Sequence, residues 1–281
     1  MRLKADLTLL LVTILWGSAF VFQRIVGEQG GVYFFNGMRF LLGALILFPF
    51  LRKKDTVSKE QWIWMGIAGS ILFVAAALQQ TGIQYTTAGN AGFITIMSVA
   101  IVPFVLLIGW GERPRPLAVV SVVMAGVGAF LLSTGGSFKF QKGDALELAG
   151  ALFWALHLVV LGKFAARYTS IQFAAGQFLV AGLLNLATGL FLEQPQLNKD
   201  VIGAVLYTAV FSVGIGYTLQ VWAQRFTPPT DAALILSLEA VFAALTGWLF
   251  LSEMLITTQI VGCGLILGSV LLTQSRSGNS E

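Results

Sequence analysis

The sequence predicts an all-α membrane protein with ten transmembrane helices, arranged as two inverted five-helix repeats around a central cavity. Its composition, the spacing of its apolar segments and an internal repeat all indicate this fold. Of the 281 residues, 57% are hydrophobic and only 11% are charged, and the mean hydropathy is +0.83. About one quarter of the residues in a soluble domain are charged, so the surface of this chain is suited to lipid rather than to water.

Ten apolar segments follow one another, each close to the roughly 20 residues that a helix needs to cross a bilayer. They lie near residues 7–26, 32–51, 62–82, 91–110, 117–134, 145–164, 172–192, 201–222, 232–251 and 256–273. Because the segments are continuously apolar, they predict helices and not the alternating strands of a barrel. Lysine and arginine concentrate in the connections that this arrangement places in the cytoplasm. The positive-inside rule therefore predicts a multi-pass protein of the bacterial inner (plasma) membrane with cytoplasmic N- and C-termini.

The two halves of the chain, residues 1–137 and 138–281, resemble each other. Trp16 in the first segment corresponds to Trp154 in the sixth. Four further pairs share one constant offset: Gln79 with Gln220, Thr86 with Thr227, Asn90 with Asp231, and Glu112 with Glu253. Since each half holds five segments, an odd number, the second half must cross the membrane upside down relative to the first. Inverted repeats of this kind are typical of secondary transporters, whose substrate site lies near the middle of the bilayer.

Three stretches of the chain are the most distinctive: residues 15–20 (LWGSAF), residues 39–42 (RFLL) and residues 237–250 (SLEAVFAALTGWLF). They resemble the EamA family of the drug/metabolite transporter superfamily, and the resemblance covers essentially the whole chain. It implies ten helices in two inverted repeats around a central cavity, and commonly the export of amino acids or other small metabolites. Members of this family often have proline where Ala240 stands, so the ninth helix is expected to be straighter here.

Three of the ionisable residues inside the predicted helices are candidates for a functional role, because a charge within the membrane is unfavourable and usually functional. Glu239 can bind a substrate ammonium group, carry a coupling proton or form a structural hydrogen bond between helices. His157, the only histidine, can shuttle protons or remain neutral in a packed wall. Arg39 can hold a substrate carboxylate through two parallel hydrogen bonds, or it can snorkel to the outer interface and brace the helices. The structural interpretation is the favoured one for Arg39.

Trp16 and Trp154 lie near the middle of their helices, whereas most membrane tryptophans lie at the interfaces. Phe20 and Gln23 follow Trp16 at helical spacing, so this face combines aromatic and polar groups. We expect these four residues to line the cavity, where the rings suit a flat or cationic substrate. Alternatively, the two tryptophans only fill space in the packed interior.

Four uncharged polar residues lie near the ends of two predicted helices. Gln79 and Gln80 end the third segment, and Tyr217 and Gln220 end the eighth. The repeat places them at opposite mouths of one pathway. Hydrogen bonding between helices explains them equally well.

Several classes of protein are disfavoured by the residues that are absent from the sequence. One histidine and one cysteine exclude a metal cluster built on these ligands, and no H-E-x-x-H, G-x-S-x-G or P-loop pattern occurs. An enzyme is therefore disfavoured, and no cofactor is expected. A channel would be expected to show rings of charged residues or a repeated filter loop, and the sequence shows neither. The basic residues are explained by the cytoplasmic connections, so no nucleic-acid partner is expected.

The sequence therefore predicts a secondary transporter that exports small metabolites by alternating access, with aromatic or other neutral amino acids as the favoured substrates. Organic cations, drugs and sugar-type metabolites are the alternative substrates, and a membrane scaffold or sensor is the alternative without transport. The expected partners are the small-molecule substrate and the lipid bilayer, with the proton as candidate coupling ion through Glu239 or His157. The chain is expected to act as a monomer or a weak homodimer.

Overall fold

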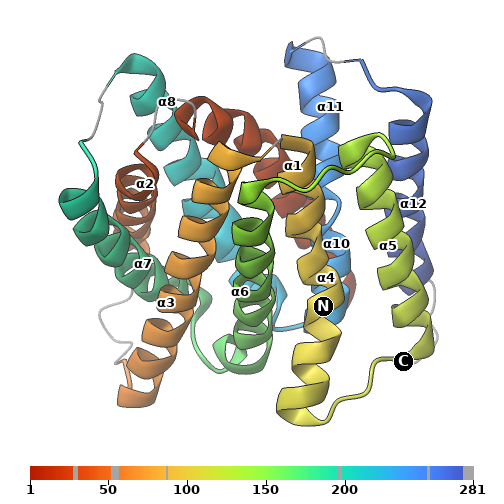
Figure 1. Ribbon diagram of the computed structural model, residues 1–281. Coiled ribbons are helices and arrows are strands. Elements are labelled where there is room, and N and C mark those ends of the chain that lie inside the picture. Colours follow the sequence, from red (N-terminus) through yellow and green to blue (C-terminus); the bar gives the residue numbers. More distant parts are fainter. Residues whose placement is uncertain (28–30, 52–56, 87, 195–197, 252–253, 275–281) are drawn as a thin grey trace.

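The computed structural model describes residues 1–27, 31–51, 57–86, 88–194, 198–251 and 254–274, and every regular element within these ranges is a helix (Figure 1). The α-helices are α1 (Arg2–Gly27), α2 (Val32–Leu47), α3 (Lys59–Gly82), α4 (Ala88–Trp110), α5 (Pro116–Thr134), α6 (Lys142–Phe164), α7 (Ser170–Leu192), α8 (Lys199–Tyr207), α9 (Thr218–Ala223), α10 (Pro229–Leu236), α11 (Glu239–Leu251) and α12 (Thr257–Gln274). Short 3-10 turns extend α2, α3 and α6; they are η1 (Phe48–Phe50), η2 (Ile83–Tyr85) and η3 (Ala165–Arg167). A π-helix, η4 (Thr208–Tyr217), joins α8 to α9.

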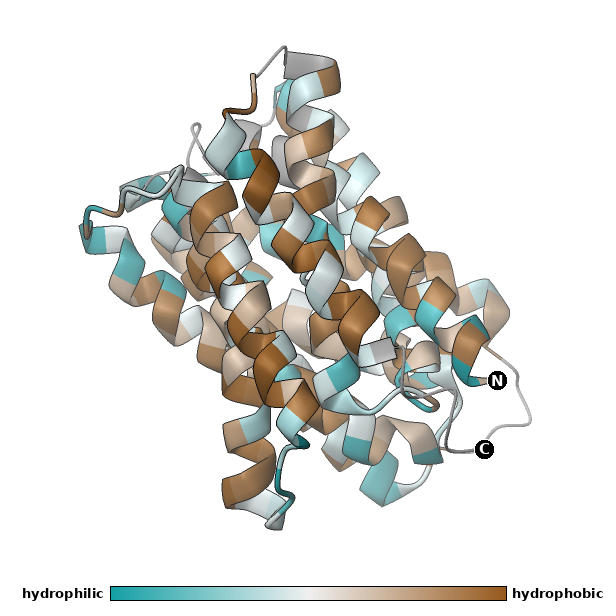
Figure 2. Ribbon diagram, turned by 90° about the vertical axis from the view of Figure 1, so that its right-hand side faces the viewer, coloured by the Kyte–Doolittle hydropathy of each residue, from teal (hydrophilic) through white to brown (hydrophobic). Residues whose placement is uncertain are grey.

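Eight helical segments among the described residues are long and apolar enough to cross a membrane. They are Val32–Phe50, Lys59–Tyr85, Asn90–Trp110, Pro116–Thr134, Lys142–Arg167, Ser170–Leu192, Lys199–Ala223 and Pro229–Thr246. α12 contains a shorter apolar stretch, Thr257–Thr273, and α1 carries charged residues toward both of its ends. Hydrophobic residues dominate the lengths of the helices, and hydrophilic residues gather mainly near their ends and in the connections (Figure 2). The chain is therefore an all-α membrane protein.

The helices pack mainly across the boundary between the two halves of the sequence. The most extensive contacts join α5 to α12, α2 to α7 and α3 to α6. α5 and α12 touch through glycine, because a Cβ added to Gly128 would lie 2.8 Å from the carbonyl oxygen of Gly262. A Cβ added to Gly262 would lie 2.6 Å from the carbonyl oxygen of Gly128. Small residues permit this close approach of two membrane helices, and the two halves thereby interleave.

Two large apolar clusters form most of the interior, and a smaller third one joins α1, α2 and α8. Of the two large clusters, one is built mainly from α1, α4, α5, α10 and α12, and the other from α2, α3, α7 and η4, with α6 contributing to both. Trp16 on α1 packs against both large clusters. The boundary between the two large clusters therefore runs past this residue, and several buried polar groups lie there.

The ninth segment predicted from the sequence, residues 232–251, is interrupted in the structure just before Ala240. α10 ends two residues before α11 begins. The N–H of Leu238 donates to the carbonyl oxygen of Ile235, three residues back, over 3.1 Å. Ser237 Oγ donates to the carbonyl oxygen of Leu234 over 2.6 Å. The interruption therefore forms with Ala240 in place of proline, and a helix straighter than that of relatives with proline stays a prediction.

Candidate functional site

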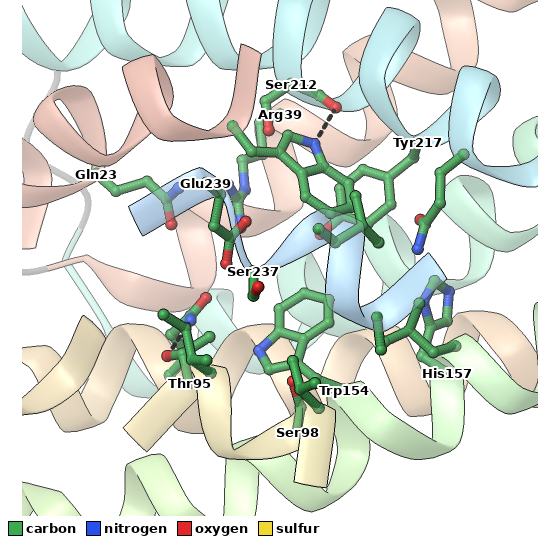
Figure 3. A pocket seen from close by; sticks show the side chains of 18 residues that line it. Gln23, Arg39, Thr95, Ser98, Trp154, His157, Ser212, Tyr217, Ser237 and Glu239 are labelled. Carbon is green, nitrogen blue, oxygen red and sulfur yellow. Dashed lines mark hydrogen bonds between the residues drawn. The ribbon is translucent and has the colours of Figure 1, made fainter. Parts of the chain in front are cut away.

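A cavity lies where the two large apolar clusters meet (Figure 3). It offers about 70 Å³ to the centres of water-sized molecules. One water needs roughly 10–15 Å³ by this measure, so the space holds several waters or a small solute. The lining residues are Trp16, Gln23, Arg39, Gln79, Thr95, Ile96, Ser98, Val99, Trp154, His157, Leu158, Ser212, Tyr217, Gln220, Ala233, Leu236, Ser237 and Glu239.

Most of the residues that the sequence nominates for a substrate site meet at this cavity. They are Trp16, Gln23, Arg39, Gln79, Trp154, His157, Tyr217, Gln220 and Glu239. Gln80 does not line it, because its Nε2 turns toward α1 and donates to the carbonyl oxygen of Gln23 over 3.0 Å. Phe20 belongs to α1, but its side chain lies outside the described residues.

Arg39 lies on α2 and lines the cavity. Its side chain is 3% exposed, so it does not reach the surface as a snorkelling residue would. The guanidinium Cζ lies 5.1 Å from the ring centroid of Phe35 and 5.0 Å from that of Phe40, in range of cation–π attraction. Its Nε has no hydrogen-bond partner in the protein. The described residues also provide no carboxylate that forms an ion pair with Arg39.

Glu239 is the first residue of α11, directly after the interruption of the ninth segment. Its carboxyl group faces the same space as Ser237 and Trp154 (Figure 3). A carboxylate at the start of a helix is stabilised by the helix dipole. Within the described part of the chain, no cationic side chain forms an ion pair with it. Arg39 and Glu239, two groups of opposite charge, therefore line one cavity without forming an ion pair.

His157 is held in the cavity wall by α7. It is 1% exposed, and its Nε2 lies 2.9 Å from Oε1 of Gln177. Because an amide oxygen only accepts hydrogen bonds, this contact places a hydrogen on Nε2. The imidazole ring meets Tyr217 and Trp154 edge-on, with centroids 6.1 Å and 6.3 Å away.

Three aromatic rings pack together in the cavity wall. The ring centroids of Trp16 and Tyr217 are 4.7 Å apart, and Trp154 stacks on Tyr217 at 6.3 Å. Trp16 Nε1 donates to the carbonyl oxygen of Ser212 over 3.1 Å, whereas Trp154 Nε1 has no protein partner. Ser212 and Tyr217 both belong to η4, and π-helical segments occur frequently at functional sites.

Four hydroxyl side chains of the wall escaped the sequence-based prediction. Thr95 and Ser98 are three residues apart on α4 and so share one helix face. Polar residues at this spacing within an apolar segment are a signal that identifies a buried polar face. Ser212 and Ser237 lie in η4 and at the interruption of the ninth segment. Single serines give no comparable signal, because they occur widely in membrane helices.

A first polar cluster, formed by Arg2, Asp6, Thr227 and Asp231, joins α1 to the start of α10. Thr227 Oγ1 donates to the Asp6 carboxylate over 2.7 Å. Arg2 donates to the Asp6 carboxylate over 3.1 Å and to the Asp231 carboxylate over 2.6 Å. Since Arg2 bridges both carboxylates, the cluster ties the first helix to the ninth segment.

A second polar cluster, formed by Thr86, Asn90 and Asp144, joins the start of α4 to the start of α6. The Asp144 carboxylate accepts hydrogen bonds from the Thr86 hydroxyl and from Asn90 Nδ2, the latter over 3.1 Å. It also accepts from the main-chain N–H of Gln141 over 2.7 Å. Because an ionised carboxylate can accept all of these hydrogen bonds, the charged form of Asp144 is well solvated by the protein.

The two polar clusters contain corresponding residues. Thr227 and Asp231 follow Thr86 and Asn90 by the offset that relates the other late pairs, and Asp144 follows Asp6 by the offset that separates the two cavity tryptophans. α1 rises from the N-terminus in Figure 1, while α6 descends from the connection at the top. The clusters therefore lie toward opposite ends of the helix bundle.

Comparison with known proteins supports a role in transport. The EamA-like transporter family model matches the chain twice, over residues 3–134 and 141–274. An uncharacterized transporter of Archaeoglobus fulgidus is 34% identical over 276 residues, 98% of this chain and 87% of the relative. The threonine/homoserine exporter RhtA of Escherichia coli is 26% identical and is matched over 92% of this chain and 86% of its own.

A solved crystal structure shares the fold over 100% of both chains, with a TM-score of 0.85 and 19% sequence identity. A WAT1-related chloroplastic protein of Arabidopsis thaliana is 25% identical over 94% of this chain and 68% of its own. The family matches extend over both halves of the chain and include the residues of the cavity. This protein therefore belongs to the EamA family of the drug/metabolite transporter superfamily and is a multi-pass membrane transporter.

Proposed function

We propose that this transporter carries zwitterionic metabolites, foremost aromatic or other neutral amino acids, and exports them by alternating access. The observation that carries the proposal is a cavity lined by both Arg39 and Glu239, which do not pair with each other. A neutral amino acid has one carboxylate and one ammonium group, so it satisfies both side chains at once. The relative RhtA is named as an exporter of threonine and homoserine, two amino acids of this type.

The two charged residues take different roles in this proposal. Arg39 binds the substrate carboxylate, because a guanidinium presents parallel N–H donors that match a carboxylate. Glu239 accepts hydrogen bonds from the substrate ammonium group. A buried charge without a partner is unfavourable, and a zwitterion supplies a partner for each group without adding net charge to the cavity.

The remaining lining residues surround the substrate side chain. Trp16, Trp154 and Tyr217 provide an aromatic wall that suits an aromatic or aliphatic group. Trp154 Nε1 and Gln220 Oε1 are buried without protein partners. They supply one donor and one acceptor for polar atoms of the substrate.

Arg39 also distinguishes the proposed substrate from the alternatives. An organic cation satisfies Glu239 and the aromatic rings, but it brings a second positive charge into the cavity that holds Arg39. A sugar-type metabolite leaves both charged groups without a counter-charge. The zwitterion therefore fits this cavity better than either alternative.

The proposed topology has ten spans in two inverted repeats, residues 1–137 and 138–281. The spans are α1 to α7, the segment from α8 to α9, the segment from α10 to α11, and α12. The two matches of the family model and the opposite directions of α1 and α6 support this arrangement. With both termini in the cytoplasm and the protein in the inner membrane, the first polar cluster lies on the cytoplasmic side and the second on the outer side. The two halves rock against each other around the cavity.

The driving force in this scheme is the substrate gradient or a proton gradient that acts through Glu239 or His157. Both side chains line the cavity, so binding of a proton there competes with or accompanies binding of the substrate. Glu239→Gln is expected to abolish the pH dependence of transport if Glu239 carries the coupling proton. If the pH dependence of transport is unchanged in this variant, Glu239 does not carry the coupling proton.

The experiment that tests the substrate class is counterflow of labelled amino acids in proteoliposomes, with chemically matched competitors. A neutral aromatic amino acid is compared with its methyl ester, which lacks the carboxylate, and with its N-acetyl form, which lacks the ammonium group. We expect only the zwitterion to compete strongly. Arg39→Gln should remove the preference for the free acid over the ester, and Glu239→Gln the preference for the free amine over the N-acetyl form.

The matched controls are Arg167→Gln and Glu60→Gln. These two residues form an ion pair of 3.2 Å in which both side chains are 59% exposed, so neither substitution should alter the competition profile. Equal competition by the acid, the ester and the N-acetyl form would exclude the zwitterion proposal. Competition by organic cations or sugars alone would favour the corresponding alternative.

A further inference from the structure

Glu147 is a buried carboxyl group outside the substrate cavity. It lies on α6, one turn after Asp144 of the second polar cluster, and is 0% exposed. We propose that Glu147 binds a proton from the outer side, and that this protonation is required for the second polar cluster to close. The proposal rests on the alternating-access transport proposed for this protein, to which it adds a proton-binding site.

The hydrogen bonds around Glu147 fit a protonated carboxyl group. Its Oε2 lies 3.5 Å from Thr95 Oγ1, and its Oε1 has no partner. The single hydroxyl hydrogen of Thr95 has a nearer acceptor, the carbonyl oxygen of Ala91 at 2.9 Å. Thr95 Oγ1 also accepts from Gln79 Nε2 over 3.0 Å. The Thr95 hydroxyl therefore offers Glu147 at most a long, shared hydrogen bond of 3.5 Å, so an ionised carboxylate would be buried without a good donor.

The helices packed against Glu147 bring no cation to it. α4 has no ionisable side chain. α3 has only Lys59 and Glu60, at its beginning, whereas Gly82 at its end covers the carboxyl group. A Cβ on Gly82 would lie 2.8 Å from Glu147 Oε1, so the main chain of α3 seals this side. Asp144, one turn away on α6, carries a charge of the same sign.

The other ionisable groups on neighbouring elements are engaged elsewhere or exposed. Tyr85 of η2 is 58% exposed, Asp231 of α10 is bonded to Arg2, and Arg167 of η3 is bonded to Glu60. On α6 itself, His157 contacts Gln177, Lys163 pairs with Glu112, and Lys142 begins the helix. An ionised Glu147 would therefore be buried beside Asp144 without a counter-charge, which is strongly disfavoured.

Opening at the second polar cluster changes this environment. Separation of α4 from α6 breaks the hydrogen bonds from Thr86 and Asn90 to Asp144 and admits water to Glu147. The carboxyl group then transfers its proton to water, giving a carboxylate and a hydronium ion. Closing reverses the step, and no other covalent bond changes. Because Thr95 touches Glu147 and lines the cavity, the proton site lies next to the substrate space.

The first polar cluster has no equivalent group. The offset that relates Asp6 to Asp144 also relates Leu9 to Glu147, and Leu9 is apolar and 0% exposed. The first cluster instead contains Arg2, whose guanidinium keeps its charge at all physiological pH values. The outer pH therefore acts on one of the two clusters only.

The test uses one engineered cysteine as a reporter of opening. In a Cys263→Ser background, which removes the only native cysteine, Ala91→Cys places a thiol beside the second polar cluster at a position that is 3% exposed. Its rate of reaction with a membrane-impermeant maleimide in right-side-out vesicles is divided by the rate for Tyr85→Cys, an exposed position. This ratio corrects for the pH dependence of thiol chemistry. It is expected to rise with outer pH, by up to about tenfold per pH unit for one linked proton.

Substitutions of Glu147 identify the group that titrates. Glu147→Gln imitates the protonated form and should keep the ratio low at every pH. Glu147→Asp retains a carboxyl group and should shift the rise of the ratio to a different outer pH. Comparison of this variant with the parent therefore tests the proposal even if Glu147→Gln does not fold. Glu60→Gln, which removes an exposed carboxylate outside the cavity and outside both polar clusters, should retain the pH response of the ratio.

Two results overturn the proposal: a parent ratio that does not depend on pH, or a Glu147→Gln variant that responds like the parent. The accessibility measurement needs no substrate. Its failure is therefore distinguishable from failure of the amino-acid competition experiment, which tests the proposed function.

Discussion

The indole Nε1 of Trp16 donates a hydrogen bond to the main-chain carbonyl oxygen of Ser212 over 3.1 Å, and this bond anchors α1 to the π-helix η4. Trp154, its counterpart in the second half of the chain, lines the same cavity with an Nε1 that has no protein partner. The two corresponding rings thus differ in their polar contacts. One is fixed by the protein, and the other keeps a donor for the contents of the cavity.

Substitution of each tryptophan by phenylalanine should separate these two roles. Trp16→Phe retains a ring but leaves the Ser212 carbonyl without this donor, and is expected to lower the free energy of unfolding by about 1–3 kcal/mol. Trp154→Phe removes a donor that has no partner, so its stability should equal or exceed that of the parent. Thermal unfolding of the purified variants in detergent measures the difference, and equal losses in both variants would contradict this assignment.

The interruption of the ninth segment predicts tolerance of proline at position 240. The N–H of Ala240 makes only a long contact, 3.4 Å, to the carbonyl oxygen of Ser237, and proline is favoured in the first turn of a helix. Ala240→Pro should therefore fold and retain transport. Ala244→Pro, in the interior of α11, should destabilise the protein by about 3 kcal/mol. The yield of monodisperse protein and counterflow activity distinguish the two, and comparable damage from both would show that α11 begins elsewhere.

The contact between α5 and α12 predicts a strong effect of a single methyl group. Gly128→Ala places a Cβ within 2.8 Å of main-chain atoms of α12, and overpacking of this kind typically destabilises by about 1–3 kcal/mol. Gly264→Ala is the matched control, because no heavy atom lies within 4 Å of its added Cβ. Alanine is favoured over glycine in a helix, so the control should be neutral or more stable. The midpoints of thermal unfolding provide the comparison, and a stable Gly128→Ala variant would refute the close approach.

The first polar cluster predicts that Arg2 is needed to hold α1 against α10. Arg2→Gln leaves the carboxylates of Asp6 and Asp231 without their shared cation. Because these side chains are partly exposed, we expect a loss of about 1–2 kcal/mol, below the roughly 3–5 kcal/mol of a fully buried pair. Arg167→Gln, which breaks the exposed pair with Glu60, should change the unfolding free energy by less than about 1 kcal/mol. Chemical denaturation of both variants tests the order, and a larger effect at Arg167 would reverse it.

The membrane architecture was readable from the sequence because lipid imposes a simple requirement on composition. A helix that crosses a bilayer must be apolar over most of its length, and eight such segments appear in the described residues. The ten-span topology remains a prediction. The local backbone was less predictable, because neither η4 nor the interruption between α10 and α11 contains a proline that would predict it.

The cavity wall was predictable to the extent that its residues are unusual in lipid. Trp16, Trp154 and Glu239 stand out because large polar or charged groups near the middle of a helix are rare. Glu147 did not stand out, because it lies near the start of its segment, where solvated carboxylates are common. Only the packing of Gly82 against it reveals that this carboxyl group is sealed. The position of a residue in the sequence indicates its depth in the membrane. Which face of its helix is covered, however, depends on helices that are distant in the chain.

The interleaving of the two halves has a consequence for biosynthesis. α2 makes its largest contact with α7 and α5 with α12, so the ribosome delivers each of these first helices to the bilayer long before its partner exists. Until then, the glycine face of α5 around Gly128 is covered by lipid chains and must later exchange them for α12. Insertion of α12 into the bilayer completes this contact. The packing of α5 therefore cannot be finished until a helix more than a hundred residues further along the chain has been made.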